Sequence, residues 1–126
     1  MKEHDRFREH VGIEVHEVKE GFARLSMRIT ADHLNVVGYT HGGAIFALAD
    51  CAFAEACNFG DNKAVAVQVG INYLKPSSEG DTLVAEAMKV SEGKTFALYS
   101  VTVSKRDKLV ATFSGLAYKL HDEERT

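Results

Sequence analysis

The sequence predicts an α+β fold in which one long central helix is wrapped by an antiparallel sheet of about six strands. Residues 42–59 are apolar nearly all round a helical wheel, and residues 13–30 alternate between apolar and polar side chains. Four further strand-like segments follow, separated by short turns. A helix that is apolar on every side must be buried on every side. In a chain of 126 residues only a sheet, helped by a partner subunit, can bury it.

The first third of the chain is expected to form a short helix and a hairpin. Residues 3–10 fit a turn of amphipathic helix that ends near Gly12. From Gly12 to residue 30 the apolar side chains recur at every second position, interrupted by a turn at residues 18–21. This pattern is typical of a hairpin with one wet and one dry face. Residues 31–41 have little periodicity and are expected to form a loop.

The rest of the chain supplies the central helix and four strands. Six alanines among larger apolar residues make 42–59 a strong helix former, about 27 Å long. Strands are expected at 63–75, 81–91, 94–105 and 108–120, and the short turns predict that the last three form an antiparallel meander. In the first of these strands one face is expected to carry Val65, Val67, Val69, Ile71 and Tyr73.

Composition and charge exclude several classes of protein. The chain is 45% hydrophobic and 26% charged with a single proline, which is typical of a globular domain. A net charge of −3 argues against nucleic acid as a partner. No stretch approaches the roughly 18 apolar residues of a membrane span, and no apolar run follows the charged N-terminus as it would in a signal peptide.

The two cysteines indicate a reducing compartment. Cys51 and Cys57 lie six residues apart on the predicted helix, which separates them by about 9 Å along the axis. That distance is too long for a disulfide. We therefore expect two buried thiols and a cytoplasmic protein.

Two features of the central helix are able to carry chemistry. Gly42 and Gly43 open it, and a helix N-terminus offers unpaired N–H groups and partial positive charge to an anion or oxyanion. The alternative is simply a tight passage from loop to helix. Asp50 shares a face with Phe46 and Phe53, where a lone carboxylate is costly. Either function or an ion pair with an Arg or Lys can explain it.

The spacing of Gly42 and Asp50 predicts a shared site. Eight residues place them about 12 Å apart along one helix. A base and an oxyanion donor that serve one carbonyl must both lie about 3 Å from the reacting group. One helix cannot supply both, but two antiparallel helices across a two-fold axis can. If both residues act on one bond, the protein is at least a dimer.

Other catalytic signatures are missing from the sequence. There is no HExxH or CxxC pattern, so no metal site is expected. There is also no GxSxG elbow and no P-loop, which argues against a serine hydrolase and a P-loop nucleotide enzyme. Among the six histidines, His41 is distinguished by its position directly before Gly42.

The stretch LNVVGYTHGG at 34–43, followed by Leu-Ala-Asp at 48–50, resembles the hotdog-fold acyl-CoA thioesterases. More specifically, it resembles the phenylacetate-degradation type within the 4-hydroxybenzoyl-CoA thioesterase superfamily. The pattern of that type is an Asn, a short loop, His-Gly-Gly and an acidic residue seven positions after the second Gly. The resemblance covers about residues 10–120 and implies a single hotdog domain over 1–126. It also implies a homotetramer built from two dimers, with each thioester bound between two subunits.

The resemblance also implies roles for the four residues of this pattern. Asp50 takes the place of the family's general base or nucleophile. Gly42 matches the backbone N–H that polarises the thioester carbonyl. Asn35 and His41 match residues that orient the substrate or the water at that carbonyl.

Further positions are implied to contact the substrate. The family often has a Ser or Thr near 66–68 that assists the base, and Gln68 is the one residue there that could replace it. The substrate-binding residues implied in this chain are Gly43, Gln68, Tyr73, Ser91 and Lys94, the last three as coenzyme A contacts.

The expected function is hydrolysis of a small or aryl acyl-CoA thioester to the free acid and coenzyme A. No cofactor is expected, because coenzyme A is part of the substrate. Two alternatives stay open: a non-catalytic acyl-CoA-binding hotdog module and a hotdog dehydratase. The chain lacks the dehydratase motifs and retains Asp50. The acyl group itself is not determined by the sequence.

Overall fold

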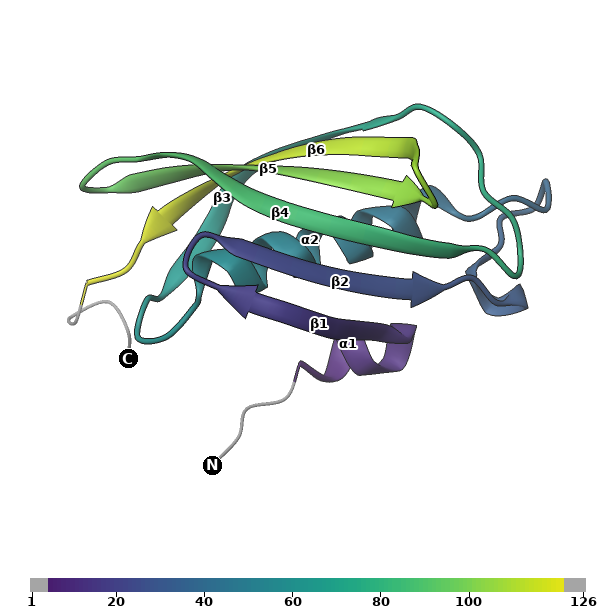
Figure 1. The fold of residues 1–126 in the computed structure, drawn as a ribbon, viewed down its shortest axis with the longest axis horizontal. Helices are drawn as coiled ribbons and strands as arrows, with labels where there is room; N and C mark the ends of the chain where they lie inside the picture. Colours follow the sequence, from purple (N-terminus) through teal and green to yellow (C-terminus); the bar gives the residue numbers. More distant parts are fainter. Residues whose placement is uncertain (1–4, 122–126) are drawn as a thin grey trace.

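The computed structural model describes residues 5–121, which form one six-stranded antiparallel sheet folded around a long helix (Figure 1). The strand order is β1-β2-β4-β5-β6-β3, so β1 and β3 are the two edges. The elements in chain order are α1 Arg6–Val11, β1 Ile13–Lys19, β2 Phe22–Arg28, the 3₁₀ turn η1 Ala31–His33, α2 Gly42–Cys57, β3 Ala64–Tyr73, β4 Thr82–Glu92, β5 Phe96–Lys105 and β6 Lys108–Lys119.

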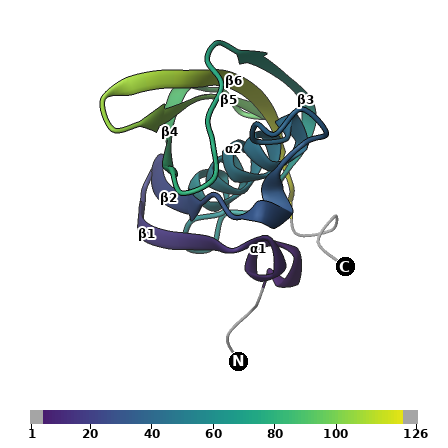
Figure 2. The same ribbon diagram turned by 90° about the vertical axis from the view of Figure 1, so that its right-hand side faces the viewer.

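Helix α2 lies in the concave side of the curved sheet, as the all-round apolar pattern predicted (Figure 2). The α+β fold class and the β4-β5-β6 meander are confirmed. The helix ends at Cys57, two residues before the predicted end, because Asn58 turns back and donates from Nδ2 to the carbonyl of Ala54 at 2.9 Å. Phe53 is the largest fully buried side chain and packs against the rings of Tyr99 and Phe113.

The prediction that Val65 and Val67 share a face of β3 with Val69 and Ile71 is wrong. A β-bulge shifts the β3–β6 register between Ala66 and Gln68. The extra residue reverses which side of the strand faces the core. Val65 and Val67 are therefore exposed, at 47% and 53%, while the residues beyond the bulge that pack on the core are Val69 and Ile71.

Helix α1 is a short cap that is attached to α2. Asp5 accepts a hydrogen bond from the backbone N–H of Arg8, and Gly12 ends the helix with a φ of +88°. Such a φ favours glycine. The Arg8 guanidinium forms an ion pair with Glu55 on α2. This pair holds α1 beside the second half of the central helix.

The structure also bears on two expectations drawn from composition. Cys51 and Cys57 are both buried and both free, as predicted. Within residues 5–121 no helix has the length and apolar character needed to cross a membrane.

Candidate active site

The N-terminus of α2 leaves one backbone donor free. His41 caps the helix: its Nδ1 accepts from the Gly43 N–H at 2.8 Å, and its carbonyl accepts from the N–H groups of Ala44 and Ile45. The N–H of Gly42 has no hydrogen-bond partner among residues 5–121. A free donor at the positive end of a helix is suited to hold a carbonyl oxygen that gains negative charge.

The cap also selects the tautomer of the neutral His41 ring. Because Nδ1 accepts a hydrogen bond, the proton of the neutral ring is on Nε2. That Nε2–H is available to a bound molecule, since the ring is exposed. The N–H of Gly43, a residue expected to bind substrate, is occupied by this cap.

Tyr73 lies against Gly42 and explains why glycine is needed there. Its hydroxyl donates to the Gly42 carbonyl at 2.9 Å. A Cβ on Gly42 would lie 3.2 Å from Tyr73 Cζ and 3.3 Å from its hydroxyl oxygen, so any side chain would displace the ring. Tyr73 was expected to contact coenzyme A, and the structure places it at the predicted oxyanion donor.

Asn35 organises the loop before the helix. Its Oδ1 accepts from three backbone N–H groups, those of Val37, Gly38 and Tyr39, at 3.0 to 3.1 Å. The Asn35 carbonyl oxygen is therefore occupied, and its Nδ2 remains as the donor that could reach a substrate. Asn35, Gly42 and Tyr73 line one cavity of about 410 Å³.

A second cavity lies on the other side of the helix start. It is also about 410 Å³, within the roughly 300–1,000 Å³ of ligand pockets. His41 and Gly43 border it. Its apolar lining residues are Phe7 and Val11 of α1, Leu34 of the loop, and Ala44 and Ala47 of α2.

Asp50 is a half-buried carboxylate without a partner. No hydrogen bond or ion pair joins its side chain to any residue in 5–121. The pKa of Asp50 is raised, first because burial removes solvent from the carboxylate and second because the carboxylate of Asp5 lies nearby. An ion pair was the alternative explanation for Asp50, and it is absent from this part of the chain, since Arg8 pairs with Glu55 instead.

The structure brings together only some of the predicted residues. Asn35, His41, Gly42, Gly43 and Tyr73 surround the start of α2. The others lie apart: Asp50 is two turns along α2, Gln68 is on the exposed edge strand β3, and Ser91 and Lys94 are near the β4–β5 turn beyond the C-terminus of α2. A single chain therefore holds the oxyanion donor but not the base beside it.

No metal centre is formed by the described residues. Within 5–121 no group of three or more His, Cys, Asp or Glu side chains is placed to hold an ion. Each thiol is also a poor nucleophile, because burial raises the pKa of Cys51 to about 12 and that of Cys57 to about 11.

The family model described as thioesterase superfamily matches residues 37–112. The chain belongs to this superfamily. The acyl-coenzyme A thioesterase PaaI of Escherichia coli strain K12 is 40% identical over 121 residues, covering 95% of this chain and 86% of that protein. Acyl-coenzyme A thioesterase 13 of Homo sapiens is 32% identical over 89 residues, covering 68% of this chain and 64% of that protein.

Solved structures agree with the superfamily assignment. A mutant of phenylacetic acid degradation protein PaaI from Thermus thermophilus has a TM-score of 0.89 and 38% identity, covering 92% of this chain and all of that one. A Streptococcus mutans UA159 protein with acetyl-CoA bound has a TM-score of 0.82 and 28% identity, covering 86% of this chain and 89% of that one. The hotdog fold and the resemblance to PaaI-type thioesterases are confirmed.

For this superfamily member, sequence reasoning missed two parts of the site. The apolar cavity beside His41 depends on α1, whose Phe7 and Val11 gave only a weak amphipathic signal. Lys75 lines the cavity shared by Asn35 and Gly42 and was given no role. Its position two residues after Tyr73 was the signal that could have placed it there.

Proposed function

We propose that this chain hydrolyses acyl-CoA thioesters to a free acid and coenzyme A. The observation that carries the proposal is the combination on α2 of a free Gly42 N–H with an unpaired, half-buried Asp50. Family membership supports it, as do the E. coli relative named an acyl-coenzyme A thioesterase and the S. mutans structure that holds acetyl-CoA.

The chemistry follows from these two groups. The Gly42 N–H donates to the thioester carbonyl oxygen and stabilises the negative charge that develops there. Asp50 as general base takes a proton from water while the water oxygen bonds to the carbonyl carbon. The C–S bond then breaks, and the thiolate of coenzyme A leaves and takes up a proton. As a nucleophile, Asp50 would instead form an acyl anhydride that water hydrolyses to the same products.

Two side chains next to Gly42 position the reactants. The Nε2–H of His41 and the Nδ2 of Asn35 are the donors left after the loop and the cap are satisfied. We assign both to the orientation of substrate or water. The apolar cavity bordered by His41 is of a size for a small or aryl acyl group.

A second copy of the chain completes the site. Gly42 and Asp50 are about 12 Å apart along one helix, so Gly42 of one subunit must face the Asp50 of another. The edge strand β3 supports this pairing, because its ten residues include no charge and no proline and leave Val65 and Val67 exposed. Such an edge is a ready surface for another strand.

The same two-fold arrangement accounts for the separated coenzyme A contacts. Antiparallel helices bring the C-terminal end of α2 in one subunit toward the N-terminal end in the other. Tyr73 from one chain and Ser91 and Lys94 from the other then contact one coenzyme A, with Gln68 on the edge strand near the water. We further propose that two dimers assemble into a tetramer. The protein is placed in the cytoplasm and uses no cofactor in this proposal.

A thiol-release assay tests the proposed function. The purified chain is mixed with a panel of alkyl- and aryl-CoA thioesters and a thiol reagent, with Asp50→Asn as the control. Release of free coenzyme A by the wild type alone supports a thioesterase, and the panel identifies the acyl group. Binding without release would instead indicate an acyl-CoA-binding module, and hydration of an enoyl-CoA would indicate a dehydratase.

A further inference from the structure

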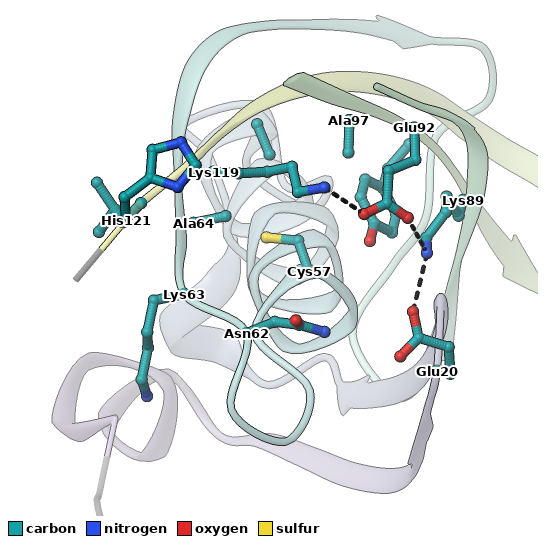
Figure 3. Close-up of a pocket in the computed structure, with 13 residues that line it drawn as sticks. Glu20, Cys57, Asn62, Lys63, Ala64, Lys89, Glu92, Ala97, Lys119 and His121 are labelled. Carbon is teal, nitrogen blue, oxygen red and sulfur yellow. Dashed lines mark hydrogen bonds and ion pairs between the residues drawn. The ribbon is translucent and has the colours of Figure 1, made fainter. Parts of the chain in front are cut away.

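A third cavity lies at the opposite end of α2 from Gly42. It has a volume of about 190 Å³ and is enclosed by Cys57 at the helix end, by the loop before β3 and by the ends of the strands at the β4–β5 turn (Figure 3). At about 30 Å³ per water it has room for roughly six water molecules. None of the residues assigned to thioester hydrolysis lines it.

The cavity contains the hydroxyl of a tyrosine whose ring is buried in the core. Tyr99 is only 4% exposed, and its ring packs edge-on against Phe53. Its hydroxyl has no hydrogen-bond partner within residues 5–121, and it is not sealed from solvent. Burial raises the pKa of Tyr99, so the phenol stays protonated and can donate. A hydroxyl that opens into the cavity in this way is free to donate to a ligand or to water.

Two ammonium groups at the rim have donors to spare. Lys89 contacts Glu20 at 2.8 Å and Glu92 at 2.6 Å, and Lys119 contacts Glu92 at 2.6 Å and the Gly93 carbonyl at 3.0 Å (Figure 3). An ammonium has three donors, so one remains on each lysine. The charges of Lys89 and Lys119 balance those of Glu20 and Glu92, while the Lys63 side chain extends away from these groups (Figure 3). Because these charges balance, the spare donors favour an anion of single charge over one of higher charge.

The walls between these groups are apolar. Ala64, Ala97 and Ala117 line the cavity together with Cys57. The thiol of Cys57 is uncharged at neutral pH, because burial raises its pKa to about 11. The lining therefore combines a hydrocarbon surface with three hydrogen-bond donors.

We propose that this cavity binds a short-chain monocarboxylate. The carboxylate accepts hydrogen bonds from the Tyr99 hydroxyl and from the free donors of Lys89 and Lys119. The hydrocarbon part lies against the three alanines. A phosphate would bring more negative charge next to Glu20 and Glu92 and would leave the alanine surface unfilled. The site shares no lining residue with the proposed active site, and binding there does not depend on hydrolysis.

Methyl NMR locates the bound acid. Protein with ¹³C-labelled alanine methyl groups is titrated with sodium butyrate, whose six non-hydrogen atoms match the volume, and with butyramide as the neutral control. We expect saturable shifts of Ala64, Ala97 and Ala117, and binding of butyramide at least about tenfold weaker. Shifts confined to Ala44 and Ala47 would place the acid at the proposed active site and overturn the proposal, as would equal binding of butyramide.

Variants identify the donors. Tyr99→Phe removes only the hydroxyl and should weaken butyrate binding about three- to tenfold. Lys119→Met changes a partly exposed rim residue, so folding is preserved, and should weaken binding about tenfold. Tyr118→Phe, a tyrosine outside the cavity, is the matched control and should leave the affinity unchanged, as should Asp50→Asn. Unchanged affinity in both Tyr99→Phe and Lys119→Met, or stronger shifts with inorganic phosphate than with butyrate, would refute the site.

Discussion

Asp50 and Glu55 are the two acidic residues of α2, and their surroundings differ in one decisive way. Both are half-buried. Glu55 is paired with Arg8 of α1, whereas Asp50 has no cation and no hydrogen bond among the residues described. Asp5 places a second negative charge near Asp50 and raises its pKa further.

The difference supports a structural role for Glu55 and the proposed catalytic role for Asp50. The fold provides an arginine to a carboxylate on this helix only one and a half turns beyond Asp50. A partly desolvated carboxylate left unpaired weakens folding, and such groups concentrate at functional sites. The comparison therefore supports the proposal that Glu55 attaches α1 and that Asp50 carries the chemistry.

The largest expected effect separates the two carboxylates by kinetics. Asp50→Asn should lower kcat by about 10²- to 10⁴-fold, because the amide cannot accept the proton from water. Glu55→Gln is the matched control and should leave kcat within about twofold. Both are measured by steady-state release of coenzyme A. Near-normal turnover in Asp50→Asn would contradict a catalytic role for Asp50. An equal loss in Glu55→Gln would contradict a purely structural role for Glu55.

A change on the edge strand tests whether Asp50 needs a partner. Val67→Lys places a charge on the exposed edge of β3, and lysine on an edge discourages strand pairing. We expect dissociation, and with it a loss of activity of about 10²-fold, since the base would no longer reach a carbonyl. Val15→Lys on the other edge strand, β1, is the control and should change neither the oligomeric state nor the activity. Sedimentation velocity and the activity assay report both, and an active Val67→Lys monomer would contradict a shared site.

The pH dependence of activity tests the neighbour of Asp50. The base works only when ionised, so activity falls as the pH drops through its raised pKa. Asp5→Asn keeps an N-cap for α1 but removes the charge, which should lower the pKa of Asp50. On the acidic limb, kcat/KM should rise roughly two- to threefold, while the neutral plateau stays the same. If the acidic limb of the kcat/KM profile lies at the same pH in Asp5→Asn as in the wild type, Asp5 does not act on Asp50.

The smallest expected effect concerns stability. Glu55→Gln should lower the free energy of unfolding by about 1 kcal/mol, because it removes a partly exposed ion pair. Asp50→Asn should preserve or raise it. Ionising Asp50 is harder in the folded chain than in the unfolded chain, because its folded pKa lies above the ordinary 3.8. The resulting loss of stability is absent at low pH and grows as the pH rises from 3.8 through the raised pKa. Urea unfolding at fixed protein concentration should therefore show a larger gain from Asp50→Asn at pH 7 than at pH 3.5.

Much of the fold was predictable because its signals are local. The all-round apolar run predicted a helix inside a sheet, and alternation with short turns predicted the hairpin and the meander. The bulge in β3 was not predictable, since a one-residue slip leaves the valine-rich sequence unchanged while it exposes Val65 and Val67.

The sequence supplied candidate residues for the site but not the contacts that they make. The sequence identified Gly42 and Asp50, and the helix rise alone separated them by about 12 Å. The contact of Tyr73 with Gly42 and the pairing of Arg8 with Glu55 join residues 31 and 47 positions apart, so no local pattern reveals them. The use of Asn35 Oδ1 by its own loop likewise depends on a backbone shape that only the structure shows.

Complementation between two inactive variants tests the shared site most directly. Asp50→Asn removes the base, and Gly42→Pro removes the oxyanion donor at a helix position where proline is tolerated. The extended backbone of His41 also accommodates a following proline. The two variants are dissociated, mixed in equal amounts and reassembled, with subunit exchange confirmed by mass spectrometry of tagged chains. In a random mixture each site draws its Gly42 and its Asp50 from different chains, so about a quarter of the sites are intact and activity should recover to roughly a quarter of wild type. Confirmed exchange without recovery would mean that every site keeps one defect, and it would contradict an active site built from two subunits.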